Sequence, residues 1–190
     1  MTLLVLGLAI FLGIHSIAIV AAPLRDGLAR RLGELPWKGL YAVISIVGFV
    51  LLVRGYAAAR LAPTALWSPP VATRHVAALL MLPVFPLLLA AYLPGRIQRA
   101  TRHPMLLATM LFAAAHLLAN GNLADVVLFG SIGSWALADR VSVARRPPRA
   151  IPGAPPARAN DAIAVVLGIA LYVAFVAGLH ARLIGVSPFG

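Results

Sequence analysis

The stretch LLVLGLAIFLGIHSIAIVAA, residues 3–22, decides the fold class of this chain. It contains no charged side chain, and a helix needs roughly twenty apolar residues to cross the hydrocarbon core of a bilayer. Of all 190 residues, 62% are hydrophobic and 11% are charged, whereas soluble domains hold about 45–50% apolar and about 25% charged residues. This composition excludes a soluble enzyme and a disordered region, and the lack of cysteine excludes a disulfide-stapled module. The chain is therefore expected to be an integral membrane protein.

Further apolar runs predict an all-α fold, a polytopic transmembrane helix bundle that forms a single membrane domain over residues 1–190. The fourth and fifth runs are short, and a re-entrant hairpin is the alternative interpretation for them. Before the last run, five prolines within residues 145–158 predict an extended linker, because proline breaks helices. The six predicted spans are residues 3–22, 39–59, 75–93, 104–120, 123–138 and 162–186.

The distribution of Lys and Arg predicts the orientation. Twelve of the sixteen lie between spans 1 and 2, 3 and 4, or 5 and 6, and four lie on the other side. The positive-inside rule places the more basic loops in the cytoplasm, so both termini are predicted to be periplasmic. The same rule accounts for the net charge of +11, so membrane lipids are the expected partners and nucleic acid is not. A cleaved signal peptide is the alternative for residues 3–22, but its positive charges would precede the apolar run rather than follow it.

Ionisable side chains inside or beside the spans are the candidate functional residues, because a charge in hydrocarbon is costly. Histidines spread over several helices fit a haem, whose iron is commonly held by imidazole, and helix packing is the alternative role for each. Arg54 is expected to pair with Asp125 or with an anionic group of a ligand. The candidates are His15, Arg54, His75, His103, His116, Asp125 and His180.

The segment Thr101-Arg102-His103-Pro104 predicts the start of a helix, because proline is favoured in the first turn. Three arginines crowd this positive helix end, which favours anions. A negative group is therefore expected beside Arg102 and His103, either a lipid headgroup or a bound phosphate or carboxylate.

Short motifs stand at the ends of the apolar runs and within them. As a set, they resemble the NnrU family of bacterial integral membrane proteins along the full chain. These motifs are Gly13-Ile14-His15-Ser16, Pro36-Trp37-Lys38-Gly39-Leu40-Tyr41, Leu66-Trp67, Pro69-Pro70, Arg74-His75, Tyr92-Leu93-Pro94-Gly95, Arg102-His103-Pro104-Met105, Ala115-His116-Leu117-Leu118-Ala119-Asn120-Gly121 and Leu183-Ile184-Gly185-Val186-Ser187-Pro188.

The resemblance implies a protein of the bacterial inner membrane linked to nitrite and nitric oxide reduction. The family is also similar to the 15-cis-ζ-carotene isomerase of plants and cyanobacteria, a haem b membrane enzyme. Its iron ligands correspond to His15 and His116, and the Cys it has three residues before the second His is replaced here by Ala113. The expected function is thus haem b-dependent redox or nitric oxide chemistry, or isomerisation of a lipid-soluble substrate.

Other residues complete this expected haem site. His75 is the fallback ligand, because it is predicted to lie at the depth of His116 in the bilayer. Arg54 and Arg74 are candidates to neutralise the haem propionates. Asn120 and Asp125 flank the turn between the fourth and fifth spans and are further candidates.

Two other functions remain open at this point. The Arg-His-Pro motif at residues 102–104 resembles the helix start of membrane methyltransferases that bind S-adenosylmethionine. Those enzymes follow it with paired glutamates and tyrosines, and residues 139–156 contain neither residue type. The other alternative is a non-catalytic membrane assembly or sensor subunit.

Overall fold

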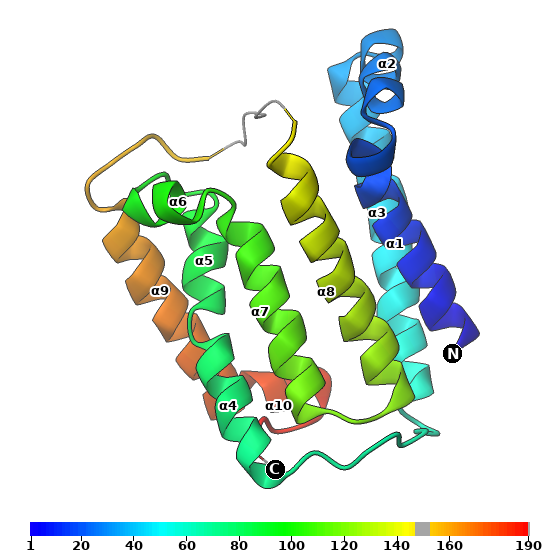
Figure 1. Cartoon of the computed structure of the whole chain (residues 1–190), viewed down its shortest axis with the longest axis vertical. Helices are drawn as coiled ribbons and strands as arrows, with labels where there is room; N and C mark the ends of the chain where they lie inside the picture. The colour runs from blue at the N-terminus through cyan, green and yellow to red at the C-terminus, as the bar shows by residue number, and fades with distance from the viewer. Residues whose placement is uncertain (147–152, 190) are drawn as a thin grey trace. The chain divides into compact units, whose positions relative to one another are not determined.

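The computed structural model describes residues 1–146 and 153–189, which confirm the predicted all-α fold (Figure 1). Within these ranges the only extended pairing is an isolated β-bridge between Ala65 and Asn122. The helices form two compact units, each assembled from two segments of the chain. Unit one comprises Met1–Trp67 and Asn122–Arg146, and unit two comprises Ser68–Gly121 and Pro147–Gly190.

Five helical segments among the described residues are long and apolar enough to cross a membrane. A sixth apolar helix, α7, is shorter and spans Pro104–Ala119. The six predicted spans therefore each correspond to a helical segment, and a crossing by all six stays a prediction. The five long segments are α1 (Thr2–Val20), α3 (Glu34–Ala59), α4 with α5 (Val71–Ala90), α8 (Leu123–Val143) and α9 through α10 (Asn160–Ile184).

Unit one is built on a close pair of helices, α1 and α3, against which α8 packs. Glycine makes the pair possible, because a Cβ on Gly7 would overlap the backbone of Leu52, and one on Gly55 would overlap the backbone of Leu4. Small residues are the usual means of close approach between membrane helices, where van der Waals contact replaces the hydrophobic effect. Leu4 and Leu52 are accordingly among the buried residues.

The segment between the first two spans is a helix, α2 (Ala22–Leu32), rather than a loop. The α1 helix ends before it because Pro23 has no N–H to donate to the preceding turn. Gly33 separates α2 from α3 with a φ of 87°, a conformation that favours glycine. Pro36 is tolerated in the first turn of α3, where the backbone N–H groups need no intrahelical partner.

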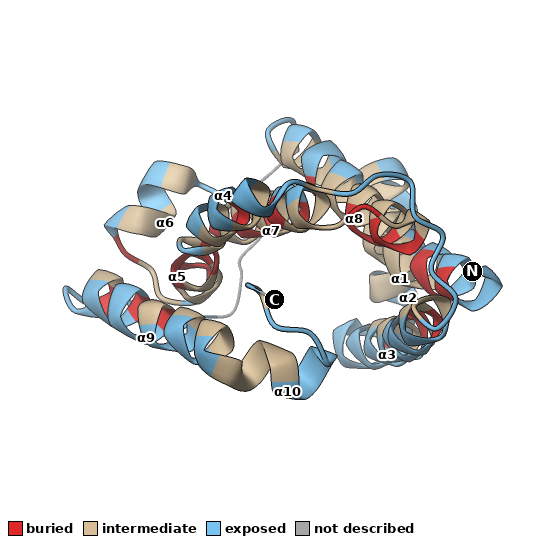
Figure 2. Cartoon of the chain, turned by 90° about the horizontal axis from the view of Figure 1, so that it is seen from below, coloured by how far each residue is buried: buried red, intermediate tan, exposed pale blue. Residues whose placement is uncertain are grey.

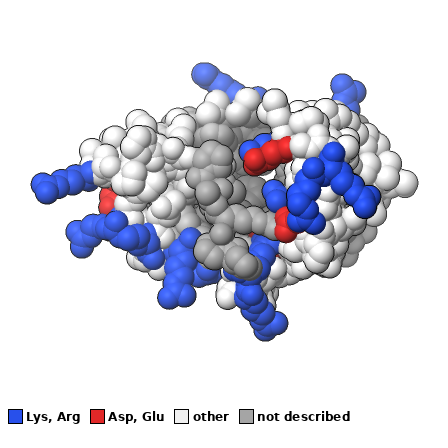
Figure 3. All heavy atoms as spheres, turned by 90° about the horizontal axis from the view of Figure 1, so that it is seen from above, with Lys and Arg blue, Asp and Glu red and all other residues white. Residues whose placement is uncertain are grey.

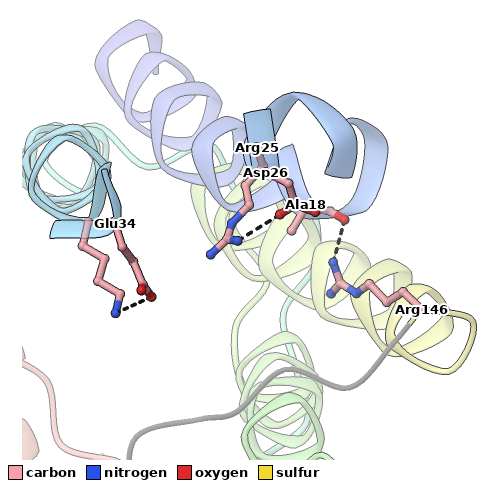
Figure 4. Close-up of polar contacts among 6 residues, drawn as sticks. Ala18, Arg25, Asp26, Glu34 and Arg146 are labelled. Carbon is pink, nitrogen blue, oxygen red and sulfur yellow. Dashed lines mark hydrogen bonds and ion pairs between the residues drawn. The ribbon is translucent and has the colours of Figure 1, made fainter. Parts of the chain in front are cut away.

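Polar contacts tie the α2 end of unit one together (Figure 4). The guanidinium of Arg146 donates to the carbonyl of Ala18 at 2.6 Å and forms an ion pair with Asp139, which joins the segment after α8 to α1. Lys38 pairs with Glu34 at 2.9 Å within the first turns of α3. This end of unit one is basic, since α2 carries Arg25, Arg30 and Arg31, and Lys and Arg are far more frequent than Asp and Glu among the side chains in Figure 3.

Unit two has its core where α5 (Val84–Ala90) meets α7, and the buried positions of both helices are red in Figure 2. Val84, Leu87 and Ala108 form the buried cluster. The predicted third span divides at Leu82–Pro83 into α4 (Val71–Met81) and α5, as expected from the prolines in its middle.

The α9 helix (Asn160–Ala174) is joined to α6 (Arg96–Thr101) by its first residues. The carboxylate of Asp161 accepts hydrogen bonds from the backbone N–H groups of Arg96 at 2.8 Å and Ile97 at 3.0 Å. The buried amide of Asn160 donates to the carbonyl of Pro94 at 2.9 Å.

The last predicted span is not one straight helix. After α9 come a kinked segment (Phe175–Leu179) and the short helix α10 (His180–Ile184). Gly178 breaks the helical path with a φ of 154°, and Gly185 ends α10 in the left-handed conformation. The following residues turn back, so that the carbonyl of Phe189 accepts a hydrogen bond from Arg74 at 3.2 Å.

The predicted proline-rich linker is described only in part. Residues 153–157 are not helical, as expected, and the N–H of Ala154 donates to the carbonyl of Tyr92 at 2.8 Å. Residues 147–152, which include Pro147, Pro148, Arg149 and Pro152, lie outside the described residues.

Candidate functional site

In the part of the chain that the structure describes, the candidate histidines lie singly or in pairs and belong to no larger cluster of metal-ligating side chains. Among the described residues, no group of three or more His, Asp or Glu side chains is arranged to hold a metal ion. The first candidate ligand, His15, belongs to unit one, and the second, His116, belongs to unit two.

His15 lies where three helices of unit one meet. Its ring centre is 4.3 Å from that of Phe11 on α1, 5.2 Å from that of Tyr41 on α3 and 5.8 Å from that of Trp135 on α8. Its Nδ1 is 2.6 Å from the carbonyl oxygen of Phe11. Because a carbonyl can only accept, Nδ1 carries the hydrogen, and in the neutral imidazole the lone pair is then on Nε2.

Trp135 adds a polar group to this aromatic cluster, and no sequence motif points to it. Its indole Nε1 is buried and has no hydrogen-bond partner among the described residues. Buried indole N–H groups usually find an acceptor. The sequence signal was weak, because a tryptophan in a membrane helix is ordinary and only the packing of α8 against α1 brings it to His15.

His116 repeats the local arrangement of His15. Its Nδ1 is 2.8 Å from the carbonyl oxygen of Phe112, and the two ring centres are 4.2 Å apart. Each of the two histidines follows a phenylalanine by four residues and donates its Nδ1 hydrogen to the carbonyl of that phenylalanine, so both have the same tautomer. This Phe-x-x-x-His spacing is visible in the sequence at residues 11–15 and 112–116.

The structure brings His180 to His116, with ring centres 6.5 Å apart and an interplanar angle of 32°. The Nδ1 of His180 is 2.6 Å from the carbonyl oxygen of Val186, so this imidazole too has its hydrogen on Nδ1. His180 was a sequence candidate without an assigned role. Its approach to His116 depends on the break at Gly178, which no local pattern predicts.

His75 and Arg74, also in unit two, both contact the last residues of the chain. The ring of His75 lies 5.9 Å from that of Phe189, and Arg74 donates to the Phe189 carbonyl. The fallback role of His75 as a ligand stays a prediction.

Asp125 has a structural role at the start of α8. Its side chain is 2% exposed and accepts hydrogen bonds from the Tyr56 hydroxyl at 2.6 Å and the Asn122 side chain at 3.0 Å. It also accepts from the Asn122 backbone and so completes a capping box. The suggested ion pair with Arg54 is not formed; Arg54 is exposed on α3.

The negative group expected beside Arg102 and His103 stays a prediction. The carboxylate of Asp161 caps a different helix, because it binds at the start of α6 and not at the start of α7. His103 is the residue before α7, and Arg102 precedes it with a φ of 61°. Asn120 ends α7, and its side chain donates to the carbonyl of His116 at 2.8 Å.

Comparison with known proteins gives one match, to the model of a family. The family is described as NnrU protein, and its model matches residues 3–188, nearly the whole chain. No curated protein and no solved structure matches the chain.

Proposed function

This chain belongs to the NnrU family, and from that membership we propose that it is a haem b protein of the bacterial inner membrane. Its activity would be redox or nitric oxide chemistry linked to denitrification, or isomerisation of a lipid-soluble substrate. The apolar helices support a membrane location. His116 and His15 are the candidate iron ligands.

The state of the two imidazoles is the observation that carries the proposal. Each donates its Nδ1 hydrogen to the carbonyl of the phenylalanine four residues earlier, which puts the lone pair on Nε2. Ligating histidines in proteins usually have this arrangement, because a hydrogen bond from the other ring nitrogen fixes the tautomer and the ring orientation. This state of each imidazole supports its proposed role as an iron ligand.

Basic side chains would neutralise the propionates. Arg74 uses one nitrogen on the Phe189 carbonyl, and its guanidinium has five N–H donors in total, so a carboxylate can be bound as well. Arg54 is exposed on α3, where its guanidinium can reach an anionic group. When bound, haem supplies one-electron redox chemistry and an iron that binds nitric oxide.

The test is an absorption spectrum of the purified protein in detergent, oxidised and then reduced with dithionite. We expect a Soret band that shifts on reduction, and we expect His116→Ala to lose most of it. Leu118→Ala, a change on the same helix at a residue 40% exposed, is the control that should keep it. A colourless wild-type protein after haem supplementation would leave the non-catalytic subunit as the leading function.

A further inference from the structure

We propose that His116 and His180 ligate one transition-metal centre within unit two, either the iron of haem b or a bare divalent ion. In its haem form this inference rests on the proposed function that the chain binds haem b, and it assigns His180, in place of His15, as the second ligand of His116. The bare-ion form stands without haem.

The separation of the two rings fits a shared metal. Metal–nitrogen bonds to imidazole are about 2.0–2.1 Å, so two imidazoles on opposite sides of one metal have ring centres about 6.4 Å apart. The same bonds at a tetrahedral angle give ring centres about 5.2 Å apart. The 6.5 Å observed between His116 and His180 agrees with the first arrangement.

The Nδ1 atom of each ring is hydrogen-bonded to a backbone carbonyl, as is usual for metal-ligating histidines. His116 is anchored through Nδ1 to the Phe112 carbonyl and His180 through Nδ1 to the Val186 carbonyl. Each neutral ring then has its lone pair on Nε2. Imidazole pairs in this arrangement suit iron, copper and nickel, whereas zinc is usually tetrahedral and magnesium and calcium prefer oxygen ligands.

The fold around His180 holds this orientation in place. The kink at Gly178 sets the direction of α10, and the left-handed Gly185 returns Val186 to His180. The chain end is then fastened to α4, because Phe189 contacts both Arg74 and His75. The closing motif Leu183–Pro188 therefore contains the residue, Val186, whose carbonyl holds the imidazole of His180.

The haem form is tested by the spin state of the ferric protein, measured by electron paramagnetic resonance on the full chain. Two imidazoles give a low-spin iron. We expect His180→Ala to convert it to high spin, and added imidazole to restore the low-spin signal. Arg182→Ala, an exposed change on the same short helix, is the matched control. His180→Gln serves as a second variant if the alanine protein does not elute as a single peak.

The bare-ion form is tested by Ni²⁺ titration of haem-free protein. We expect one equivalent to bind, and both His116→Ala and His180→Ala to weaken binding by more than about 10- to 100-fold, the loss that follows when only an outer-shell partner of a metal ligand is removed. Loss of either signal in His180→Ala supports the shared centre. If His180→Ala retains both the wild-type spin state and the wild-type Ni²⁺ affinity, the inference is wrong. If the wild-type protein binds no haem, the proposed function is wrong but the bare-ion form of this inference is not. The Ni²⁺ titration then decides whether His116 and His180 share a metal ion.

Discussion

Single hydrogen bonds explain which of the candidate residues are structural. Sequence reasoning found Asp125 because a carboxylate beside an apolar run is conspicuous, but it suggested an arginine as its partner. The structure supplies Tyr56 and Asn122 instead, and Tyr56 is distant in the sequence. The partner could not be predicted, because many polar side chains lie at similar depths and only the packing of α3 near α8 selects one.

Tyr56→Phe removes one hydrogen bond to the buried Asp125 carboxylate while the ring remains. We expect the protein to lose about 1–3 kcal/mol of stability, since a buried charged acceptor is left partly unsatisfied. Denaturation in detergent with increasing sodium dodecyl sulfate measures the change. Tyr92→Phe, at a residue 48% exposed, should be neutral; an equal loss in both variants would show that the Asp125 contact contributes nothing specific.

Helices were the most predictable level of this fold. Apolar runs located all six helical segments within a few residues, because length and the absence of charge are local properties. The runs did not reveal α2, α6 or the break at Gly178, which depend on turn conformations and on contacts between segments. The same limit applies to the site, where His15 and His116 stood out through family motifs and His180 acquired its neighbour only through the folding of the last helix.

Gly55→Ala tests the close packing of α1 on α3. The added Cβ would overlap the backbone of Leu4, so the helices must separate, and we expect a loss of about 1–3 kcal/mol from overpacking. Gly130→Ala on α8 is the control, because nothing lies within 4 Å of its Cβ position, and alanine is the better helix former. Unfolding in detergent should therefore show that Gly55→Ala lowers the free energy of unfolding, whereas Gly130→Ala leaves it unchanged or raises it.

Asp161→Ala tests the junction of α6 and α9. The backbone N–H groups of Arg96 and Ile97 lose their acceptor, so we expect faster hydrogen–deuterium exchange in the peptide that contains them. Asp161→Asn keeps one acceptor oxygen and should exchange at an intermediate rate. Unchanged exchange in the alanine variant would mean that α6 is held by its other contacts.

The whole molecule is expected to lie in the membrane with its basic loops in the cytoplasm. That orientation is a prediction from the count of Lys and Arg in the loops. The same fold could cross the membrane in the opposite orientation. Because the chain has no cysteine, single cysteines report on sidedness without background labelling.

Ser187→Cys and Arg158→Cys provide this measurement. A membrane-impermeant maleimide applied to cells with a permeabilised outer membrane should label Ser187→Cys, close to the predicted periplasmic terminus. It should label Arg158→Cys only after the inner membrane is opened. The reverse pattern would invert the predicted topology.

The segments of the two units alternate along the sequence, and this order has a consequence for biosynthesis. Unit one needs Asn122–Arg146 and unit two needs Pro147–Gly190, so a ribosome that has translated residue 121 has completed neither. The α1–α3 pair can form as soon as α3 is made, because all the glycines and leucines of its contact are then present. The helices α4, α5 and α7 cannot complete their packing until α9 is made, because α5 packs against α9. Newly made protein thus passes through a stage in which both units lack a helix, and early termination anywhere before α9 leaves unit two without one of its packing helices.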